Sequence, residues 1–501
     1  MVKCDPYINV NAGTMSPYEH GEVYVTDDGA ETDLDLGNYA RFTRGLINKA
    51  NSITTGQVYK TVIEKEREGC YQGRCVQVIP HITDEIKSRI LSAAREDPDT
   101  DITIVEIGGT VGDIESVPFL EAARQMIQEW GKTNAISVHL TLIPEVGESE
   151  LKTKPTQHSV KAMQEIGIQP DILICRAPVM LDEPTRRKIA LFCNMDPDAV
   201  FTSCNIGTTI YEIPLVFFGQ KLDQVVLKKM GVESRHAKLE PWNSVMKRFA
   251  ALKNKVRIGI VGKYVEMQDT HKSVHEALFH AGLECGVEVE TVKIDSSRLD
   301  EGDAGKVLAS SEIDGVLVPG GFGPMGIIGM VRAAAWARTQ KIPFLGLGLG
   351  MQIMAIEWAR NVLGWADADS AEFNRDSKHP VISLLEEQSG MENYGETMRL
   401  GAGESVLEQG THIYAAYGKA RIHERHRNRY EFSNKYRDEM TGAGLKITGL
   451  SPDGSLVKCI EWPDHPWGVG VQFHPEFKSK PSAAAPLYRD FIAAAKQKNE
   501  K

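Results

Sequence analysis

A short apolar stretch that runs straight into a helical pattern constrains the fold of this chain more than any other feature. Residues 342–352, IPFLGLGLGMQ, read as a strand followed by a helix, with Gly348 at the junction. Such a strand-to-helix elbow lifts one residue above a parallel sheet, and that residue is normally a nucleophile. Glycine accepts the strained backbone of an elbow at little steric cost. The stretch predicts an α/β sheet with a functional position at residue 348.

Two residues near the C-terminus could serve a nucleophile at that position. His474 and Glu476 are two apart in the segment 472–476, QFHPE. On a strand, period-two alternation would point both side chains to one face, so that the carboxylate can orient the imidazole. A base, an orienting carboxylate and an elbow are the parts of a nucleophilic triad. Gly348 itself supplies no nucleophile.

A glycine-rich segment precedes the elbow. Residues 318–323 read VPGGFG, and such small residues let backbone N–H groups face a developing negative charge. A GLGLG pattern alone would be a weak signal, because glycine-rich turns are common. The three segments together, in this order, closely resemble a class I glutamine amidotransferase domain. In that family the elbow residue is a cysteine, which attacks the glutamine amide, releases ammonia and passes through a thioester. The resemblance implies that this chain keeps the fold and lacks glutamine hydrolysis.

Composition limits the class of protein. A chain of 501 residues is long enough for two or three domains with full cores. The net charge of −11 argues against general nucleic-acid binding. Eight cysteines without a paired framework indicate a reducing cytosol, hence a cytoplasmic protein. No apolar run reaches the roughly 18 residues that a membrane helix needs, so no membrane partner is expected.

The chain divides near residue 235 into two α/β patterns. In the first half, strand-like runs at 102–105 and 135–140 alternate with a helical pattern at 119–130. A new strand at 256–262 opens a second alternation. This pattern predicts two doubly wound, mostly parallel α/β domains. We expect domains at 1–234 and 256–497, joined by a linker at 235–255.

Charged residues gather in three places in the first half. Acidic side chains crowd residues 19–37 and 106–115, and like-charge repulsion makes such crowding costly unless a cation or a positive partner lies there. A solvated acidic face is the alternative. We rank it lower because residues 106–115 follow the strand expected at 102–105, at the carboxyl end where α/β sites form. Lys152 and Lys154, two apart, would present two ammonium groups to a polyphosphate if the segment is extended, although such a pair alone is usually surface.

These segments resemble the CTP synthase family over essentially the whole chain. The resemblance implies a P-loop NTPase-like synthetase domain followed by the amidotransferase domain. In the family, ATP phosphorylates O4 of UTP, and ammonia from glutamine then displaces the phosphate to give CTP. The implied ligands are UTP, CTP as product and inhibitor, ATP, glutamine or ammonia, and Mg²⁺, with GTP as an allosteric activator. The family also implies a homotetramer.

Carried over by position, the resemblance assigns four sets of residues. The metal ligands would be Asp35 and Glu106, and the triad would comprise the Gly348 position, His474 and Glu476. The UTP and CTP site would be formed by Asp113, Ile114, Glu115, Lys152, Thr153, Lys154, Pro155, Thr156, Gln157 and Lys188. Glutamine would be bound by Gly321, Leu349, Gly350, Met351, Gln352, Glu372 and Arg429.

The sequence departs from the family at two points. Gly348 stands where a cysteine is expected. The family also opens with a strand, a phosphate-binding Gly-Lys loop and a helix, whereas this chain begins at a position partway into the next strand and carries no Gly-x-x-x-x-Gly-Lys-Ser/Thr pattern. On this reading the ATP site is deficient, and a misplaced start codon or a fragment is the favoured explanation. The alternative is an inactive paralogue that acts as a regulatory or assembly subunit. A third reading, a stand-alone glutaminase, is rejected because Gly348 supplies no nucleophile and because the first half matches the CTP synthase family.

Overall fold

The chain folds as two compact units. The computed structural model describes residues 1–147, 150–234, 236–384 and 398–500. The first unit comprises Met1–Asn11 and Ala50–Lys247, and the second comprises Ala12–Lys49 and Arg248–Lys501. Residues 12–49 therefore join the C-terminal part of the chain, which no sequence pattern had indicated.

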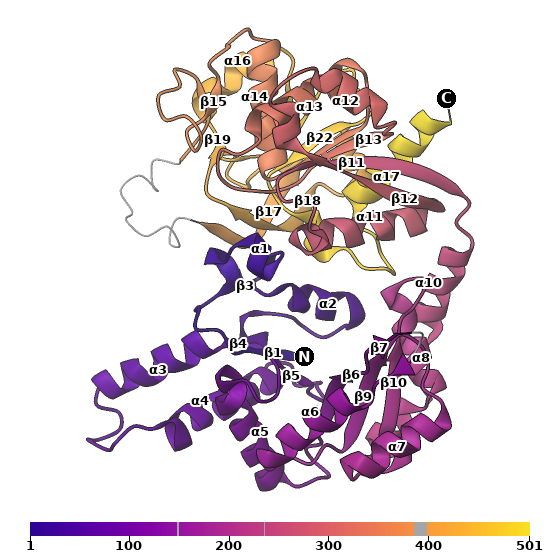
Figure 1. Cartoon of the computed structure of the whole chain (residues 1–501). Coiled ribbons are helices and arrows are strands. Elements are labelled where there is room, and N and C mark those ends of the chain that lie inside the picture. The colour runs from indigo at the N-terminus through magenta and orange to yellow at the C-terminus, as the bar shows by residue number, and fades with distance from the viewer. Residues whose placement is uncertain (148–149, 235, 385–397, 501) are drawn as a thin grey trace. The chain divides into compact units, whose positions relative to one another are not determined.

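The first unit is built on two three-stranded parallel sheets (Figure 1). The first sheet contains β1 (Val2–Asp5) between β4 (Ser52–Thr54) and β5 (Val105–Ile107). The second contains β9 (Ile172–Ala177) between β6 (Val138–Leu142) and β10 (Val200–Cys204). An antiparallel pair, β7 (Glu145–Val146) and β8 (Glu150–Leu151), follows β6.

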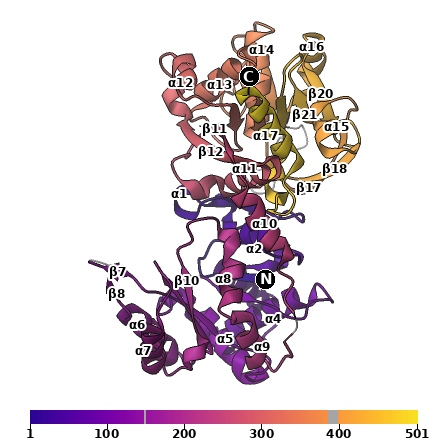
Figure 2. The ribbon, with the colours of Figure 1, turned by 90° about the vertical axis from the view of Figure 1, so that its right-hand side faces the viewer.

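Helices cover both sheets of the first unit. They are α3 (Thr55–Arg67), α4 (Thr83–Arg95), α5 (Val117–Trp130), α6 (Lys154–Glu165), α7 (Glu183–Cys193), α8 (Ile213–Gly219), α9 (Leu222–Lys229) and α10 (Glu240–Ala250), the last of which spans the boundary between units. Helices α3, α4 and α5 bury apolar side chains against β1 and β4. Helices α6 and α7 lie side by side and share a core with β9 (Figure 2).

Two strands expected from the sequence are shifted toward the C-terminus. The run 102–105 was expected as a strand, but β5 begins at Val105, and the Ile102 and Ile104 side chains are exposed. The run 135–140 was also expected, but β6 spans Val138–Leu142 and alternates exposed and buried side chains. Apolar composition marks these runs, whereas pairing with β1 and β9 sets their register. Glu106 consequently lies on a strand and not in a loop.

The second unit is built on a nine-stranded sheet. Its strands are β11 (Asn254–Gly262), β12 (Val287–Asp295), β13 (Gly315–Val318), β14 (Phe344–Leu347), β17 (Arg399–Leu407), β18 (Arg421–Asn428), β20 (Lys446–Leu450), β21 (Val457–Glu461) and β22 (Gly468–Val471). The order is β12-β11-β13-β14-β22-β21-β20-β17-β18. The pairs from β12 to β22 are parallel, and those from β22 to β18 are antiparallel. A smaller sheet joins β15 (Asp369–Ser370), β16 (Pro380–Ser383) and β19 (Glu431–Phe432).

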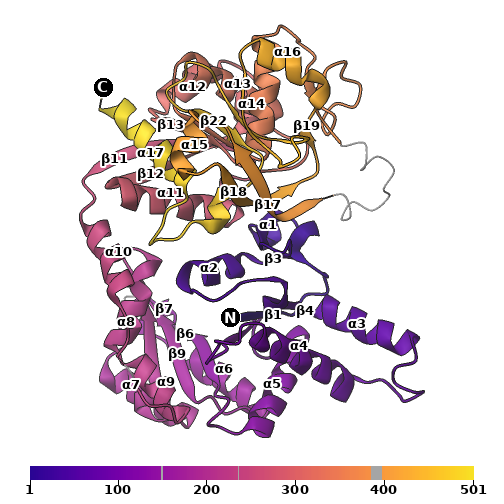
Figure 3. The same ribbon diagram turned by 180° about the vertical axis from the view of Figure 1, so that it is seen from behind.

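Helices cover both faces of the parallel strands, which confirms the predicted α/β class. One face carries α12 (Ala304–Ser310), α13 (Ile327–Thr339), α14 (Leu349–Asn361) and α16 (Arg437–Gly442), and the other carries α11 (Lys272–Cys285), α15 (His412–Tyr417) and α17 (Pro486–Asn499) (Figure 3). Side chains alternate between the two cores along each strand. On β13, Val316 and Val318 face α13 and α14, and Leu317 faces α11.

Residues 12–49 form short elements that pack on the nine-stranded sheet of the second unit. They are α1 (Pro17–His20), β2 (Tyr24–Val25), β3 (Glu31–Thr32) and α2 (Leu34–Phe42). The Tyr24 hydroxyl donates to the Phe477 carbonyl at 3.0 Å, and the Ala402 N–H donates to the Asp27 carbonyl at 2.8 Å. This segment thus reaches the residues that follow the His474–Glu476 segment.

All eight cysteines are free. Within the described part of the chain, no helix combines the length and the apolar character needed to cross a bilayer.

Candidate active site

Gly348 occupies the predicted elbow. Strand β14 ends at Leu347 and α14 begins at Leu349, so Gly348 is the only residue between them. Its backbone has φ 51° and ψ −103°, a combination that a residue with a side chain adopts only under strain. Its N–H donates to the Val471 carbonyl on β22 at 2.8 Å, which ties the elbow to the neighbouring parallel strand.

A side chain at position 348 would meet His474. A Cβ atom built on Gly348 lies 3.1 Å from His474 Nε2 and 3.2 Å from His474 Cε1. The other ring nitrogen, Nδ1, lies 2.8 Å from Glu476 Oε1. Both side chains are buried. An imidazole held at Nδ1 by a carboxylate presents Nε2 to accept a proton from a thiol or hydroxyl at the elbow.

His474 and Glu476 do not lie on a strand, contrary to the sequence-based expectation. Strand β22 ends at Val471, and residues Pro475–Lys478 form a 3₁₀ helix with His474 as its N-cap residue. Pro475 at the first helical position favours this turn. Because the helix folds Glu476 back toward the imidazole, the two side chains meet in spite of the wrong local prediction.

The glycine loop lies against the same imidazole. Strand β13 ends at Val318, and a Cβ atom built on Gly320 would lie 2.6 Å from His474 Cε1, so only glycine fits there. A Cβ atom built on Gly321 would lie 3.3 Å from Leu349 of α14. The loop therefore runs past the elbow, in the place that the sequence analysis predicted for an oxyanion loop.

Three further predicted glutamine ligands are Glu372, Gln352 and Arg429, of which Glu372 contacts this loop. Glu372 Oε1 accepts a hydrogen bond from the Gly323 N–H at 2.6 Å. Burial raises the pKa of Glu372, while the Gly323 N–H, Lys263 and Arg429 act in the opposite direction. The Gln352 side chain on α14 is buried and donates to the Tyr430 carbonyl at 3.1 Å.

The remaining predicted glutamine ligands are core residues at the start of α14. Leu349, Gly350 and Met351 are all buried. The Met351 side chain has no exposed surface, so any contact from it with a small polar ligand would need the backbone. The first N–H groups of a helix have no partner within that helix and carry the positive end of its dipole, which suits an anionic group.

The sequence analysis missed the partners of the acidic segment. Arg425 and Arg427, two apart on β18, point to residues 12–49. The Arg425 guanidinium donates to Asp27 at 2.8 Å and to the Tyr24 hydroxyl at 2.6 Å, and Arg427 donates to Glu31 at 2.9 Å. The Arg425 carbonyl in turn accepts the His474 N–H at 2.8 Å. Two carboxylates of the acidic run are therefore paired with two arginines of the basic run, beside the candidate triad. Only their opposite charges could have suggested this pairing.

A buried carboxyl group on β18 makes the stability of this unit depend on pH. Burial raises the pKa of Glu424 to about 7, against the hydrogen bond from the Tyr417 hydroxyl. Between the pKa values of the unfolded and folded states, only the unfolded chain loses the proton, so stability falls as pH rises toward 7. We expect Glu424→Gln to raise the free energy of unfolding relative to the native chain more at about pH 8 than at about pH 5, by up to about 2 to 3 kcal/mol, and the midpoint of thermal unfolding to rise accordingly.

The exposed Glu408 just after β17 offers a control for this prediction. Glu408→Gln should leave the midpoint nearly unchanged at both pH values. A difference between Glu424→Gln and the native chain that stays constant with pH would mean that Glu424 titrates in the ordinary range.

The predicted nucleotide ligands of the first unit include three lysines, Lys152, Lys154 and Lys188. Lys152 precedes α6 and pairs with Glu150 at 2.6 Å, whereas Lys154 is the first residue of α6 and its ammonium lies over the Phe192 ring of α7, 5.6 Å from the centroid. The expected extended Lys-x-Lys geometry is wrong, because Thr153 already has helical dihedral angles and Pro155 favours a helix start. Lys188 lies on α7, one turn before Phe192.

Thr156 and Gln157, which also belong to the predicted nucleotide ligands, have hydrogen-bond partners within the protein. Thr156 is buried and bonds to Thr141 and to the Leu142 carbonyl, each at 3.1 Å. Gln157 is also buried and donates to Thr153 at 3.2 Å. Asp113, Ile114 and Glu115 lie at the exposed turn that leads from β5 into α5.

The two predicted metal ligands belong to different units. Asp35 lies in the first turn of α2, in the second unit. Glu106 lies on β5, in the first unit, where its Oε1 is 3.2 Å from the Lys3 ammonium. Lys3 is also 3.8 Å from Asp5. Among the described residues, no cluster of three or more metal-ligating side chains occurs. Lys3 was not identified from the sequence.

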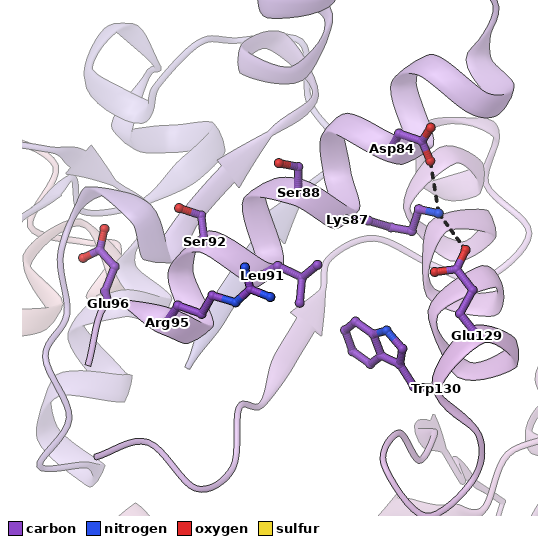
Figure 4. A pocket seen from close by; sticks show the side chains of 9 residues that line it. All are labelled: Asp84, Lys87, Ser88, Leu91, Ser92, Arg95, Glu96, Glu129 and Trp130. Carbon is purple, nitrogen blue, oxygen red and sulfur yellow. Dashed lines mark hydrogen bonds and ion pairs between the residues drawn. The ribbon is translucent and has the colours of Figure 1, made fainter. Parts of the chain in front are cut away.

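A pocket of about 770 Å³ lies between α4 and α5 (Figure 4). Lys87 bridges Asp84 at 3.1 Å and Glu129 at 2.8 Å along its wall, beside Trp130. None of the predicted nucleotide, metal or glutamine ligands lines it. The pocket is therefore separate from the predicted sites of this unit.

The geometry of the second unit agrees with comparisons to known proteins. The family description "Glutamine amidotransferase class-I" matches residues 266–494, and "CTP synthase N-terminus" matches residues 1–232. The glutaminase domain of CTPS from Trypanosoma brucei, with bound acivicin, is 38% identical, with 48% of this chain and 94% of that chain covered and a TM-score of 0.46. The family match over residues 266–494 assigns a class I glutamine amidotransferase domain to this part of the chain.

Full-length relatives define the family of the whole chain. A CTP synthase from Hydrogenobaculum sp. is 51% identical over 494 residues, which cover 98% of this chain and 91% of the relative. A CTP synthase from Carboxydothermus hydrogenoformans is 53% identical over 499 residues, covering 99% and 92%. A CTP synthase from Geobacter sulfurreducens is 52% identical over 503 residues, covering 100% and 93%. The chain belongs to the CTP synthase family, a family of ligases.

Proposed function

We propose that this protein takes part in the ATP-dependent amination of UTP to CTP, with free ammonia as the nitrogen source that its own residues can use. The observation that carries the proposal is an identity of 51% to 53% over nearly the whole chain to relatives named CTP synthase. The nitrogen source follows from Gly348, because glycine has no atom that can attack an amide carbon.

Glutamine binding is proposed to persist without hydrolysis. Glu372 would receive the α-amino group and Arg429 the α-carboxylate, since each offers the opposite charge beside the elbow. The N–H groups at Gly321, Leu349 and Gly350 would face the side-chain amide. His474 and Glu476 would then form a base without a nucleophile to deprotonate.

The first unit is proposed to bind the pyrimidine nucleotide. Lys154 and Lys188 lie on adjacent helices that pack together, which suits a triphosphate that needs several cations. Lys152 would add a third ammonium group. Asp113 and Glu115, at an exposed turn after a parallel strand, are placed to accept hydrogen bonds from a sugar or base.

Mg²⁺ is proposed to use Asp35 and Glu106. The Glu106 side chain is 40% exposed and lies 3.2 Å from the Lys3 ammonium, which is also 3.8 Å from Asp5. Carboxylate oxygens suit Mg²⁺, which keeps several waters and needs only one or two protein carboxylates. The bound ion would neutralise phosphate charge. GTP activation and a homotetramer are proposed from the family alone.

The alternative of an inactive regulatory or assembly subunit rests on Gly348. The charged residues that the family resemblance assigns to the nucleotide and the metal, Lys152, Lys154 and Glu106, are present in this chain and speak against it.

CTP binding tests the nucleotide site. We expect the chain as it stands to bind CTP in calorimetry, and Lys154→Met to weaken binding about tenfold, because a charge-assisted contact between an ammonium group and phosphate is lost. Lys161 is exposed as well but lies about two turns further along the same helix, away from its N-terminal end, so Lys161→Met should leave the affinity unchanged. Equal losses in both variants would indicate a general charge effect, and no binding by the native chain would overturn the nucleotide site.

A further inference from the structure

A buried lysine holds the glycine loop from the side opposite Glu372. Lys263 follows directly after β11 and is buried, with only 5% of the residue's surface exposed. Its ammonium donates to the Phe322 carbonyl at 2.8 Å and also to the Gly323 carbonyl. Both acceptors belong to the loop whose Gly320 lies against His474. One side chain therefore connects the first strand of the unit to the loop beside the elbow.

The peptide between Phe322 and Gly323 is fixed at both of its polar ends. Its carbonyl accepts from Lys263, and its N–H donates to Glu372 Oε1 at 2.6 Å. In a trans peptide these two groups point in opposite directions, so Lys263 and Glu372 together set the orientation of the peptide plane. Glycine residues give this loop many accessible backbone conformations. Without the two contacts, nothing in its own sequence would select one of them.

The charges of the two residues support the same arrangement. Burial lowers the pKa of Lys263 to about 8, with Glu372 acting in the opposite direction. The charged and titratable groups that face Glu372 are Lys263, from the segment after β11, and Arg429, from the turn after β18. The main chain of Lys263 is held as well, because its carbonyl contacts His271 Nε2 at 3.1 Å. Lys263 favours the charged form of Glu372, and that form can attract a second ammonium, such as an α-amino group.

We propose that Lys263 is a positioning residue for glutamine, which holds the glycine loop and Glu372 in the arrangement that receives the substrate. The proposal rests on the proposed function of this site as a glutamine site. Lys263 need not touch glutamine, because it acts through Gly323 and Glu372. It would preorganise the loop, so that binding does not have to order it.

The test is calorimetric titration of L-glutamine into the chain with its natural Gly348, at about pH 6 and about pH 8. We expect Lys263→Met to weaken glutamine binding about tenfold at the higher pH. It should weaken binding further at the lower pH, because burial raises the pKa of Glu372 and the variant lacks the Lys263 ammonium that favours the charged form. A defect that is only structural would not create this acid dependence. Lys263→Arg, which keeps the charge and the donors, should bind within about threefold of the native chain.

Two further variants complete the design. Lys341 also donates to a backbone carbonyl, that of Asp464 at 2.8 Å, but at an exposed site away from the loop. Lys341→Met should bind glutamine as the native chain does. If Lys263→Met does not fold, Lys263→Gln replaces it in the test. Glutamine keeps a hydrogen-bond donor without the charge, so this variant must show the same loss of glutamine binding at low pH.

The outcomes separate this inference from the function on which it rests. If the native chain binds no glutamine, the glutamine site and the role of Lys263 are both overturned. If the native chain binds glutamine, and Lys263→Met and Lys263→Gln bind it equally well with the same pH dependence, the site stands and the positioning role is wrong.

Discussion

Replacing Gly348 by cysteine is expected to turn a chain that releases no ammonia from glutamine into one that does. A Cβ atom at this position lies 3.1 Å from His474 Nε2, so a thiol would lie within reach of the base. Glu476 already holds the other ring nitrogen at 2.8 Å. We expect the rate of glutamate formation to rise by about 10³-fold or more over the glycine form, since nucleophile and base act as a unit.

Gly348→Ala is the matched control for this change. It adds the same Cβ atom at φ 51° and therefore the same backbone strain, about 1 to 3 kcal/mol, without a nucleophile. Both variants should lower the midpoint of thermal unfolding by similar amounts, and only the cysteine form should hydrolyse glutamine. Hydrolysis by the glycine or alanine form would show that the nucleophile lies elsewhere.

The second large effect concerns the residues that would serve the new thiol. In the Gly348→Cys background, His474→Gln is expected to reduce glutamine hydrolysis by about 10²- to 10⁴-fold, because the base is lost. Glu476→Gln should also reduce it strongly, since a neutral amide neither fixes the tautomer of His474 nor stabilises the imidazolium. The assay is glutamate release over a range of pH.

A control for the second prediction lies on the same 3₁₀ helix. Lys478 donates to the His423 carbonyl at the surface and does not contact the imidazole ring in the described contacts. In the same background, Lys478→Met should change the rate less than about threefold. A loss as large as that of Glu476→Gln would mean that the helix as a whole, and not the carboxylate, supports the site.

The elbow could be predicted from sequence because its signal is local. Apolar residues 342–347 followed by a helical pattern leave one junction residue, and Gly348 occupies it. The glycine loop followed from its spacing and composition in the same way. The pairing of His474 with Glu476 was predicted correctly, although a 3₁₀ helix and not a strand brings them together. Short-range spacing predicted the contact without predicting the local conformation.

Features that depend on distant partners could not be predicted. Whether 102–105 or 105–107 forms the strand depends on pairing with β1, about 100 residues earlier in the sequence. The place of residues 12–49 in the second unit depends on Arg425 and Arg427, some 400 residues later. Lys263 carries no local signal, because its role follows from carbonyl groups that the fold brings to it.

The most direct test of the account is the intact mass of the protein after exposure to a glutamine analogue that carries an electrophilic carbon in place of the amide. Such a reagent binds as glutamine does and marks a nucleophile at the elbow covalently. The account predicts no adduct at residue 348 in the native chain and one adduct per chain, at residue 348, in Gly348→Cys, with excess glutamine protecting the cysteine. An adduct at another residue of the native site, or an unmarked cysteine at 348, would contradict it.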